Sequence, residues 1–298
     1  MAGFLGIDHP LIAVRDIEAV RERYASLGFL MTPVSQHPWG TSTSAAVFQD
    51  CLLELMGIYD ESLIDRLPAG DFRFGRVVRD HLAEREGVSL LALNSNDADA
   101  DVRTVQERGV ASQGGIEFGR DITLPDGRPD RTSTSLRIIH DPELPRLSNF
   151  ICQQHRRDLI EVAKWLEHPN GATGICQVTV MASKQDQPRV LERMTRLYGV
   201  QAIAASPDGF SVATGNGSFV VCTREAVDAA YGSLSSSLAA DTQPCCVAVH
   251  VRMPALASVL PFLKNGMVDF EQRGKRLILT PPEAFGNVFL VFDAMPIS

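Results

Sequence analysis

Short apolar runs of strand length recur along the chain, and four of them lead into a stretch whose apolar residues are spaced as in a helix. The first run covers residues 7–14, and the helical pattern behind it starts after Asp16 and ends at Gly28. Glycine takes the left-handed conformation after a helix at no steric cost, so the chain can turn back there. The same ending is expected three more times, at Gly109-Val110, Gly199-Val200 and Gly266-Met267.

Further strand-like stretches follow each predicted helix, so the order strand, helix, strand, strand, strand occurs four times. This repetition predicts an α+β protein of four βαβββ modules, at about residues 6–58, 87–156, 173–225 and 244–294. The charged segments 60–86 and 156–171 are predicted to be helical connectors. One module cannot cover its own apolar sheet face, so we expect the modules to pair. Residues 1–165 would form the first pair and residues 166–298 the second.

Composition narrows the function classes. The net charge of −8 comes without clusters of Lys and Arg, which argues against nucleic-acid binding. No apolar run approaches the ~20 residues needed to span a bilayer, and no signal peptide is recognised, so we expect no membrane association and a cytoplasmic location. The six cysteines form no C-x-x-C pair and mostly lie in apolar runs, which predicts buried free thiols.

The first and last strands of module one each carry a side chain that can bind a metal, His9 and Glu54. Imidazole nitrogen and carboxylate oxygen together bind Fe, Mn, Ni or Zn and leave positions open for a substrate. The structural alternative is that His9 forms a hydrogen bond at a strand start and Glu54 a buried polar pair. Without metal or cation, a buried Glu54 would stay protonated and could still serve as a general acid or base.

The four βαβββ units, with Ile7-Asp8-His9 opening the first and Leu53-Glu54-Leu55 closing it, resemble the vicinal oxygen chelate superfamily, which includes glyoxalase I and the extradiol dioxygenases. Two motifs, at residues 37–41 (HPWGT) and 168–172 (HPNGA), resemble its bacterial glyoxalase-like branch more narrowly. The resemblance covers nearly the whole chain. It implies two clefts between paired modules and a divalent metal (Fe, Mn, Ni or Zn) that is held by the first and last strands of each module. A small oxygenated substrate would chelate this metal.

On this resemblance His9 and Glu54 are metal ligands, and Glu54 is also the candidate catalytic acid or base. The matching positions of module two carry Ser89 and Gln153, which are weak ligands. His155 lies two residues beyond Gln153, on the same face of the strand, and is therefore the candidate for the missing imidazole. Gln153 is a candidate substrate contact.

His37 and Trp39 lie in a loop before a predicted strand. We interpret them as substrate contacts at the edge of the cleft, with a surface turn shaped by Pro38 and Gly40 as the alternative. The glyoxalase-like branch usually has asparagine at the position of Thr43, so a contact through that amide is not expected here.

Two function classes remain open. The first is a metal-dependent lyase, isomerase or dioxygenase acting on a small oxygenated organic molecule. The second is a metal-free small-molecule binder, like the sequestering members of the superfamily, which Ser89 and Gln153 favour and for which Trp39 and Phe48 would line an aromatic-rimmed pocket. A purely structural role ranks last, because a cleft-facing His and Glu are costly to keep without use. A homodimer is compatible with this chain, but four modules can satisfy their own pairing.

Overall fold

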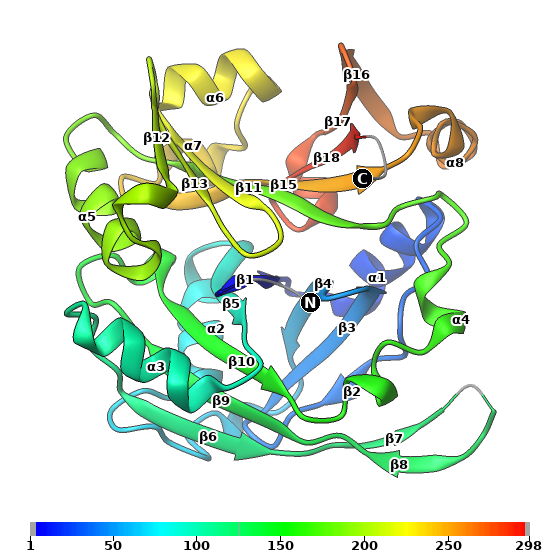
Figure 1. Ribbon diagram of the computed structural model, residues 1–298. Helices are drawn as coiled ribbons and strands as arrows, with labels where there is room; N and C mark the ends of the chain where they lie inside the picture. Colours follow the sequence, from blue (N-terminus) through cyan, green and yellow to red (C-terminus); the bar gives the residue numbers. More distant parts are fainter. Residues whose placement is uncertain (1–3, 125, 296–298) are drawn as a thin grey trace.

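Two curled eight-stranded sheets form the molecule in the computed structural model, which describes residues 4–124 and 126–295 (Figure 1). The strand order is β2-β3-β4-β1-β5-β10-β9-β6 in the first sheet and β12-β13-β14-β11-β15-β18-β17-β16 in the second. Each sheet therefore joins two four-stranded halves, and the first strands of the two halves pair antiparallel at its centre. This is the arrangement of paired βαβββ modules, and the predicted α+β fold is confirmed.

The elements are bounded as follows. The first half-sheet and its helix are β1 (Gly6–Ala13), α1 (Ile17–Ser26), β2 (Ser35–Gln36), β3 (Thr41–Phe48) and β4 (Cys51–Ile58). The second has β5 (Gly87–Asn94), α3 (Ala98–Glu107), β6 (Gly114–Phe118), β9 (Thr134–Ile139) and β10 (Asn149–Gln154), with the hairpin β7 (Asp121–Thr123) and β8 (Pro129–Arg131) inserted. The third has β11 (Gly174–Met181), α5 (Gln187–Tyr198), β12 (Ile203–Ser206), β13 (Gly209–Ala213) and β14 (Ser218–Cys222). The fourth has β15 (Cys245–Met253), α8 (Leu260–Asn265), β16 (Asp269–Arg273), β17 (Arg276–Thr280) and β18 (Phe289–Ala294). The connecting helices are α2 (Phe74–Glu84), α4 (Ala163–Leu166), α6 (Arg224–Tyr231) and α7 (Ser236–Ala240).

Glycine ends three of the four module helices as predicted. Gly28, Gly109 and Gly199 each have φ of 84°, in the region that only glycine adopts without strain. The fourth helix also ends at Gly266-Met267 as predicted, but there Gly266 has φ of −79° and the following Met267 takes the positive angle, 48°. The turn after α8 is therefore made by a residue with a side chain, which points into solvent.

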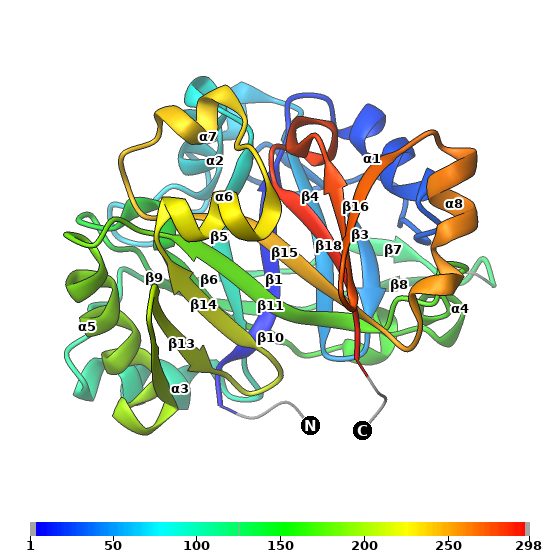
Figure 2. The same ribbon diagram turned by 90° about the horizontal axis from the view of Figure 1, so that it is seen from above.

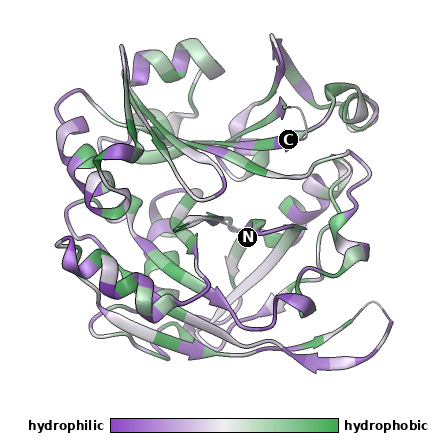
Figure 3. Cartoon of the chain, viewed as in Figure 1, coloured by the Kyte–Doolittle hydropathy of each residue, from purple (hydrophilic) through white to green (hydrophobic). Residues whose placement is uncertain are grey.

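A continuous apolar core lies between the two sheets and draws side chains from both, such as Ile12 and Leu53 from the first and Val178 and Leu290 from the second. Seen from above, the strands of the second sheet cross those of the first (Figure 2). The strands are mostly apolar in the hydropathy view, whereas the outer helices and the β7–β8 hairpin carry hydrophilic segments (Figure 3). All six cysteines are buried and free, as predicted. None of the helices described is long and apolar enough to cross a membrane.

The opposite, concave face of each sheet is partly filled by connecting helices. Helix α2 packs Phe74 and Val78 against the concave face of the first sheet, together with Trp39. Helices α6 and α7 do the same for the second sheet through Val227 and Leu238. The open space on the concave face of the first sheet is therefore limited to the part that α2 does not fill.

Gly75 lets α2 approach the loop before β3. A Cβ atom placed there would lie 2.3 Å from the carbonyl oxygen of Trp39 and 2.7 Å from the Cα of Ile64, and both are backbone atoms. We expect Gly75→Ala to lower the free energy of unfolding by about 1–3 kcal/mol, despite alanine's better helix propensity, because the helix must move away. Urea denaturation measures this, with Arg79→Ala on the exposed side of α2 as control. Equal stability of Gly75→Ala and wild type would contradict the packing described.

Candidate functional site

His9 points into the concave face of the first sheet because β1 carries a bulge. Ile7 pairs with Leu93 and His9 pairs with Ala92, so Asp8 is an extra residue without a cross-strand partner. Side chains alternate along a strand, and one inserted residue reverses the alternation. Ile7 therefore enters the core between the sheets, and His9 faces a cavity on the other side.

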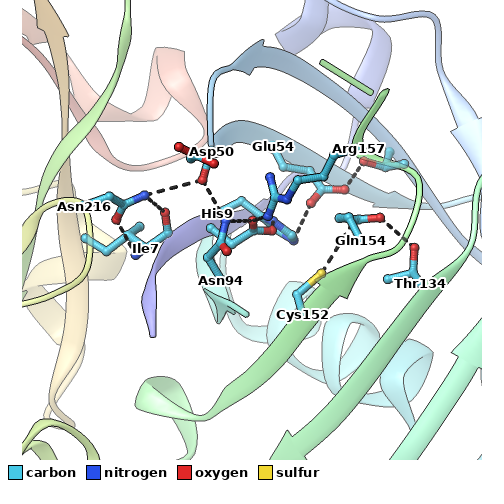
Figure 4. A network of polar contacts seen from close by, with 12 residues as sticks. Ile7, His9, Asp50, Glu54, Asn94, Thr134, Cys152, Gln154, Arg157 and Asn216 are labelled. Atoms are coloured by element: carbon cyan, nitrogen blue, oxygen red, sulfur yellow. Dashed lines mark hydrogen bonds and ion pairs between the residues drawn. The ribbon is translucent and has the colours of Figure 1, made fainter. Parts of the chain in front are cut away.

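Glu54 on the neighbouring strand β4 completes a chain of three buried side chains. His9 Nε2 lies 2.9 Å from Glu54 Oε2, and His9 Nδ1 donates to Asp8 Oδ2 at 2.6 Å (Figure 4). The second oxygen of Glu54 accepts a hydrogen bond from the Thr43 hydroxyl. The imidazole is thus held between two carboxylates, in the sequence Asp8, His9, Glu54, and the predicted pair His9 and Glu54 lies together.

The protonation of this pair follows from its surroundings. Burial favours neutral imidazole, but the charge of Glu54 and the carboxylate of Asp8 outweigh it and raise the pKa of His9 to about 10. Burial would also raise the pKa of Glu54, yet the His9 cation, together with His37 and the Thr43 hydroxyl, holds that pKa well below its usual range. At neutral pH the two side chains therefore form an ion pair.

Asp8 and the preceding residue Ile7 are held by groups from three other parts of the chain. Asn94 on β5 donates to Asp8 Oδ1 at 3.0 Å, and Arg157, after β10, lies 3.3 Å from the same oxygen. On the other side of the bulge, Asn216 of the β13–β14 turn accepts from the Ile7 N–H at 2.7 Å and donates to the Ile7 carbonyl at 2.9 Å (Figure 4). The second sheet therefore contacts the strand that carries His9.

The side chains predicted from module two lie elsewhere. Ser89 is the bulged residue of β5, and its hydroxyl donates to the Leu11 carbonyl. Gln153 accepts from the Ala98 N–H at 3.0 Å and donates to the Asn96 carbonyl at 2.8 Å, at the start of α3. His155 does lie on the face of Gln153, but this is the outer face of the sheet, where its Nε2 is 2.7 Å from Ser135 Oγ.

The two first strands carry equivalent bulges, at Asp8 in β1 and at Ser89 in β5. Ser89 therefore corresponds to Asp8, and the position that corresponds to His9 is Leu90. The parallel pairing of β5 with β10 places Phe150 where module one has Glu54. Gln154, not Gln153, faces the cavity, and its side-chain oxygen accepts from Thr134 at 2.7 Å. Module two therefore presents an apolar wall to His9, and the Phe150 ring lies 5.8 Å from the imidazole.

The cavity in the concave face contains about 390 Å³ of space not filled by protein, including solvent at its mouth. One side is polar and the other apolar. We call it the inner cavity; its lining residues are His9, Leu11, His37, Trp39, Leu52, Glu54, Met56, Phe74, Phe118, Arg120, Thr134, Leu136, Phe150, Cys152 and Gln154.

His37 and Trp39 are both buried in the wall of the inner cavity rather than in a surface turn. Their rings stack at 4.8 Å, and the edge of Phe118 meets both. Burial, reinforced by the Arg120 cation, lowers the pKa of His37 to about 3, so this imidazole is neutral. The Trp39 indole nitrogen is buried without a hydrogen-bond partner among the described residues. A donor facing a cavity in this state is free to bind a ligand oxygen.

Arg120 is the functional candidate that the sequence did not reveal. It follows β6 and donates from Nη1 to Ser35 on β2 at 2.8 Å, so it joins the two edges of the curled sheet. Its Nε is buried without a partner, and within residues 4–124 and 126–295 no carboxylate forms an ion pair with it. Module symmetry is the signal that could have found it, since Arg120 follows β6 much as His37 follows β2.

The donor set does not fit a divalent metal held by the protein alone. Catalytic metal sites usually have three protein ligands, whereas module two adds no imidazole or carboxylate to His9 and Glu54. Among the side chains that the structure describes, no group of three or more His, Cys, Asp or Glu is arranged to hold a metal. Two other side chains in the wall are of a type that binds metals. His37 is already paired through Nδ1 with the Thr41 hydroxyl at 2.9 Å, and burial raises the pKa of Cys152, so its thiol stays protonated.

The concave face of the second sheet carries a polar cluster that is satisfied within itself. His250 Nε2 lies 2.9 Å from the Tyr231 hydroxyl and 3.1 Å from Gln177 Nε2, and its Nδ1 lies 3.4 Å from Asp293. The Tyr231 hydroxyl also pairs with Thr179 at 2.7 Å. His250 is fully buried, and unlike His9 it is not among the residues that line the inner cavity, so we assign it a structural role.

Comparison with known proteins supports the fold. Residues 7–198 match the family model described as glyoxalase-like domain. A hypothetical protein from Staphylococcus aureus is similar over 98% of this chain and 100% of its own, with a TM-score of 0.68 at 12% identity. A variant of 4-hydroxymandelate synthase from Streptomyces coelicolor follows at 0.60 and 10%, covering 100% and 95% of the two chains. The Mn(II)-bound glyoxalase from Novosphingobium aromaticivorans has 0.52 and 12%, covering 98% and 82%. No curated protein matches the chain in sequence.

The raised pKa of His9 predicts how stability depends on pH. The ion pair with Glu54 should stabilise the protein fully below the ordinary histidine pKa of 6.5, and this contribution should disappear as pH rises through about 10. We expect Glu54→Gln to cost about 3 kcal/mol near neutral pH and progressively less toward pH 10. Urea denaturation across this range measures the difference, with exposed Glu61→Gln as control. A cost independent of pH would contradict the ion pair.

Proposed function

This chain belongs to the glyoxalase-like domain family of the vicinal oxygen chelate superfamily, and from that premise we propose that it binds a small oxygenated organic acid in the inner cavity. Arg120 would hold the acid group, and the His9–Glu54 pair would face the rest of the molecule. Arg120 carries this proposal, because a cation inside a cavity without a carboxylate partner is a site for a ligand anion.

The other polar groups of the inner cavity suit the same ligand. The unpartnered Trp39 N–H is a donor for a second ligand oxygen, and neutral His37 adds no competing charge. Apolar side chains such as Phe150 and Leu136 keep the opposite wall dry, which strengthens charge interactions at Arg120. A site of this kind binds acids in preference to neutral analogues.

Glu54 and His9 would supply the chemistry, if the ligand is transformed. Glu54 is the ionised group and can accept a proton from a ligand hydroxyl or from carbon next to a carbonyl, while His9 stays protonated beside it. Thr43 and Asp8 fix the orientation of the two side chains. In a metal-free sequestering protein, the second function expected from the sequence, the same pair would serve only to bind ligand oxygens.

A metal-dependent reaction remains a second candidate for one reason. His9 and Glu54 lie on adjacent strands and face one cavity, with Asp8 behind the imidazole as metal-bound histidines commonly have. Such a site would need the substrate to complete its ligands. Fe, Mn, Ni or Zn bound there would supply Lewis-acid stabilisation of ligand oxygens.

Arg120→Gln should weaken binding of pyruvate and of butanoate at least about tenfold, because the neutral amide cannot pair with the carboxylate. Arg120→Lys should retain part of the affinity. Isothermal titration calorimetry measures both, and Arg156→Gln, at a more exposed arginine, is the matched control. Unchanged affinity in Arg120→Gln would overturn the proposal.

Metal dependence is tested separately on protein purified without a histidine tag. We expect less than stoichiometric divalent metal by elemental analysis, and acid binding that survives dialysis against a chelator, because module two completes no ligand set. Stoichiometric metal that is lost in His9→Ala would instead establish the second candidate. Binding that disappears with chelator and returns with Mn²⁺ would do the same.

A further inference from the structure

We propose that the acid bound in the inner cavity carries an apolar tail, which occupies a second chamber next to it. This inference rests on the proposed function, because it takes the acid group to lie at Arg120. It adds the class of ligand: an amphipathic monocarboxylic acid with an alkyl or aryl tail.

The second chamber opens directly beyond the inner cavity. Both are lined by Leu52, Glu54, Arg120 and Gln154, so these four side chains form the boundary between them. The outer chamber contains about 990 Å³ of space not filled by protein, including solvent at its opening.

The walls of the outer chamber are mainly apolar and come from three separate parts of the chain. Strand β3 contributes Ala45 and Val47, the β7–β8 hairpin contributes Ile122, and the segment after β10 contributes Ile160 and Trp165. Besides Glu54 and Arg120 at the boundary, the wall contains the charged side chain of Asp121, which is paired with Arg131 at 2.6 Å. Burial of a hydrocarbon against these residues would be favourable, because it removes apolar surface from water.

The order of the chemical groups along the two spaces determines the orientation of the ligand. His9 lines only the inner cavity, Glu54 and Arg120 lie at the boundary, and Ile122 and Trp165 line only the outer chamber. A carboxylate at Arg120 therefore leaves the tail directed toward Ile122 and Trp165. A doubly charged acid of similar length would place its second carboxylate among apolar side chains. Arg120 is the only cation among the described residues that line the outer chamber, so such an acid should bind poorly.

A series of straight-chain acids tests the tail. We expect affinity by calorimetry to increase from butanoate through hexanoate to octanoate, by up to about fourfold for each methylene group that becomes fully buried. Octanedioate, the doubly charged analogue of octanoate, should bind at least about tenfold more weakly than octanoate.

Ile122→Asn places a neutral polar side chain in the outer wall, on a surface hairpin that the core does not depend on. It should reduce octanoate affinity about tenfold and leave butanoate affinity unchanged. Val200→Asn, at an exposed apolar residue beside α5, is the matched control and should change neither. Circular dichroism and denaturation establish that both variants are folded.

The outcomes separate this inference from the proposed function. Butanoate binding that depends on Arg120, with no gain in affinity for longer acids, would overturn the tail and leave the proposed function standing. A gain with chain length that persists in Ile122→Asn would overturn the location of the tail. Failure of every acid to bind would overturn both proposals. The chain has two tryptophans, Trp39 in the inner cavity and Trp165 in the outer chamber. The fluorescence change that octanoate causes in wild type should therefore be larger than the change it causes in Trp165→Phe, and the difference reports contact with Trp165.

Discussion

The site depends on one extra residue in one strand. The bulge at Asp8 turns His9 toward the concave face and at the same time places the Asp8 carboxylate against the far side of the imidazole. Glu54 contacts the other ring nitrogen of His9. An ionised side chain would be costly to bury alone, and the contacts among Asp8, His9 and Glu54 offset that cost. Asn94, Arg157 and Asn216 hold the bulge in place from other elements. The bulge in β1 therefore determines both the direction of the His9 side chain and the charged groups around it.

Much of the fold can be predicted from the periodicity of the sequence. The four strand-helix-glycine patterns can be recognised because each module buries apolar residues at similar positions. His9 and Glu54 can be recognised because each is a polar residue within an apolar strand. Bulges are not visible in this way, since a single inserted residue barely changes the hydrophobic pattern. The sequence pattern therefore does not indicate which of two neighbouring residues faces the cavity. Ser89 and Gln153 are the residues expected there, whereas Leu90 lies on the concave face of β5 and Gln154 lines the cavity. His155 lies on the same outer face as Gln153.

Arg120 illustrates a second limit. It lies in a polar, turn-rich insertion, where an arginine would ordinarily be solvated. Its function as a buried cation arises from closure of the sheet, which brings the end of β6 to β2, and closure is a property of the curled sheet rather than of any local segment. His250, in an apolar strand like His9, has the uncharged partners Tyr231 and Gln177 at its Nε2, where His9 has the carboxylate of Glu54. The two module pairs share one scaffold, but the chemistry of each pair depends on which residues occupy a few equivalent positions.

The contact between Arg120 and Ser35 also concerns the two edge strands of the first sheet, β2 and β6. An eight-stranded sheet normally exposes two edge strands, each with unpaired backbone groups that can recruit another chain. Here one edge strand, β2, is only two residues long, and the arginine side chain spans from the far end of the sheet to it. The same side chain that we assign to ligand binding therefore also connects the two edges of the first sheet. A substitution at Arg120 would alter the ligand site and this edge contact together.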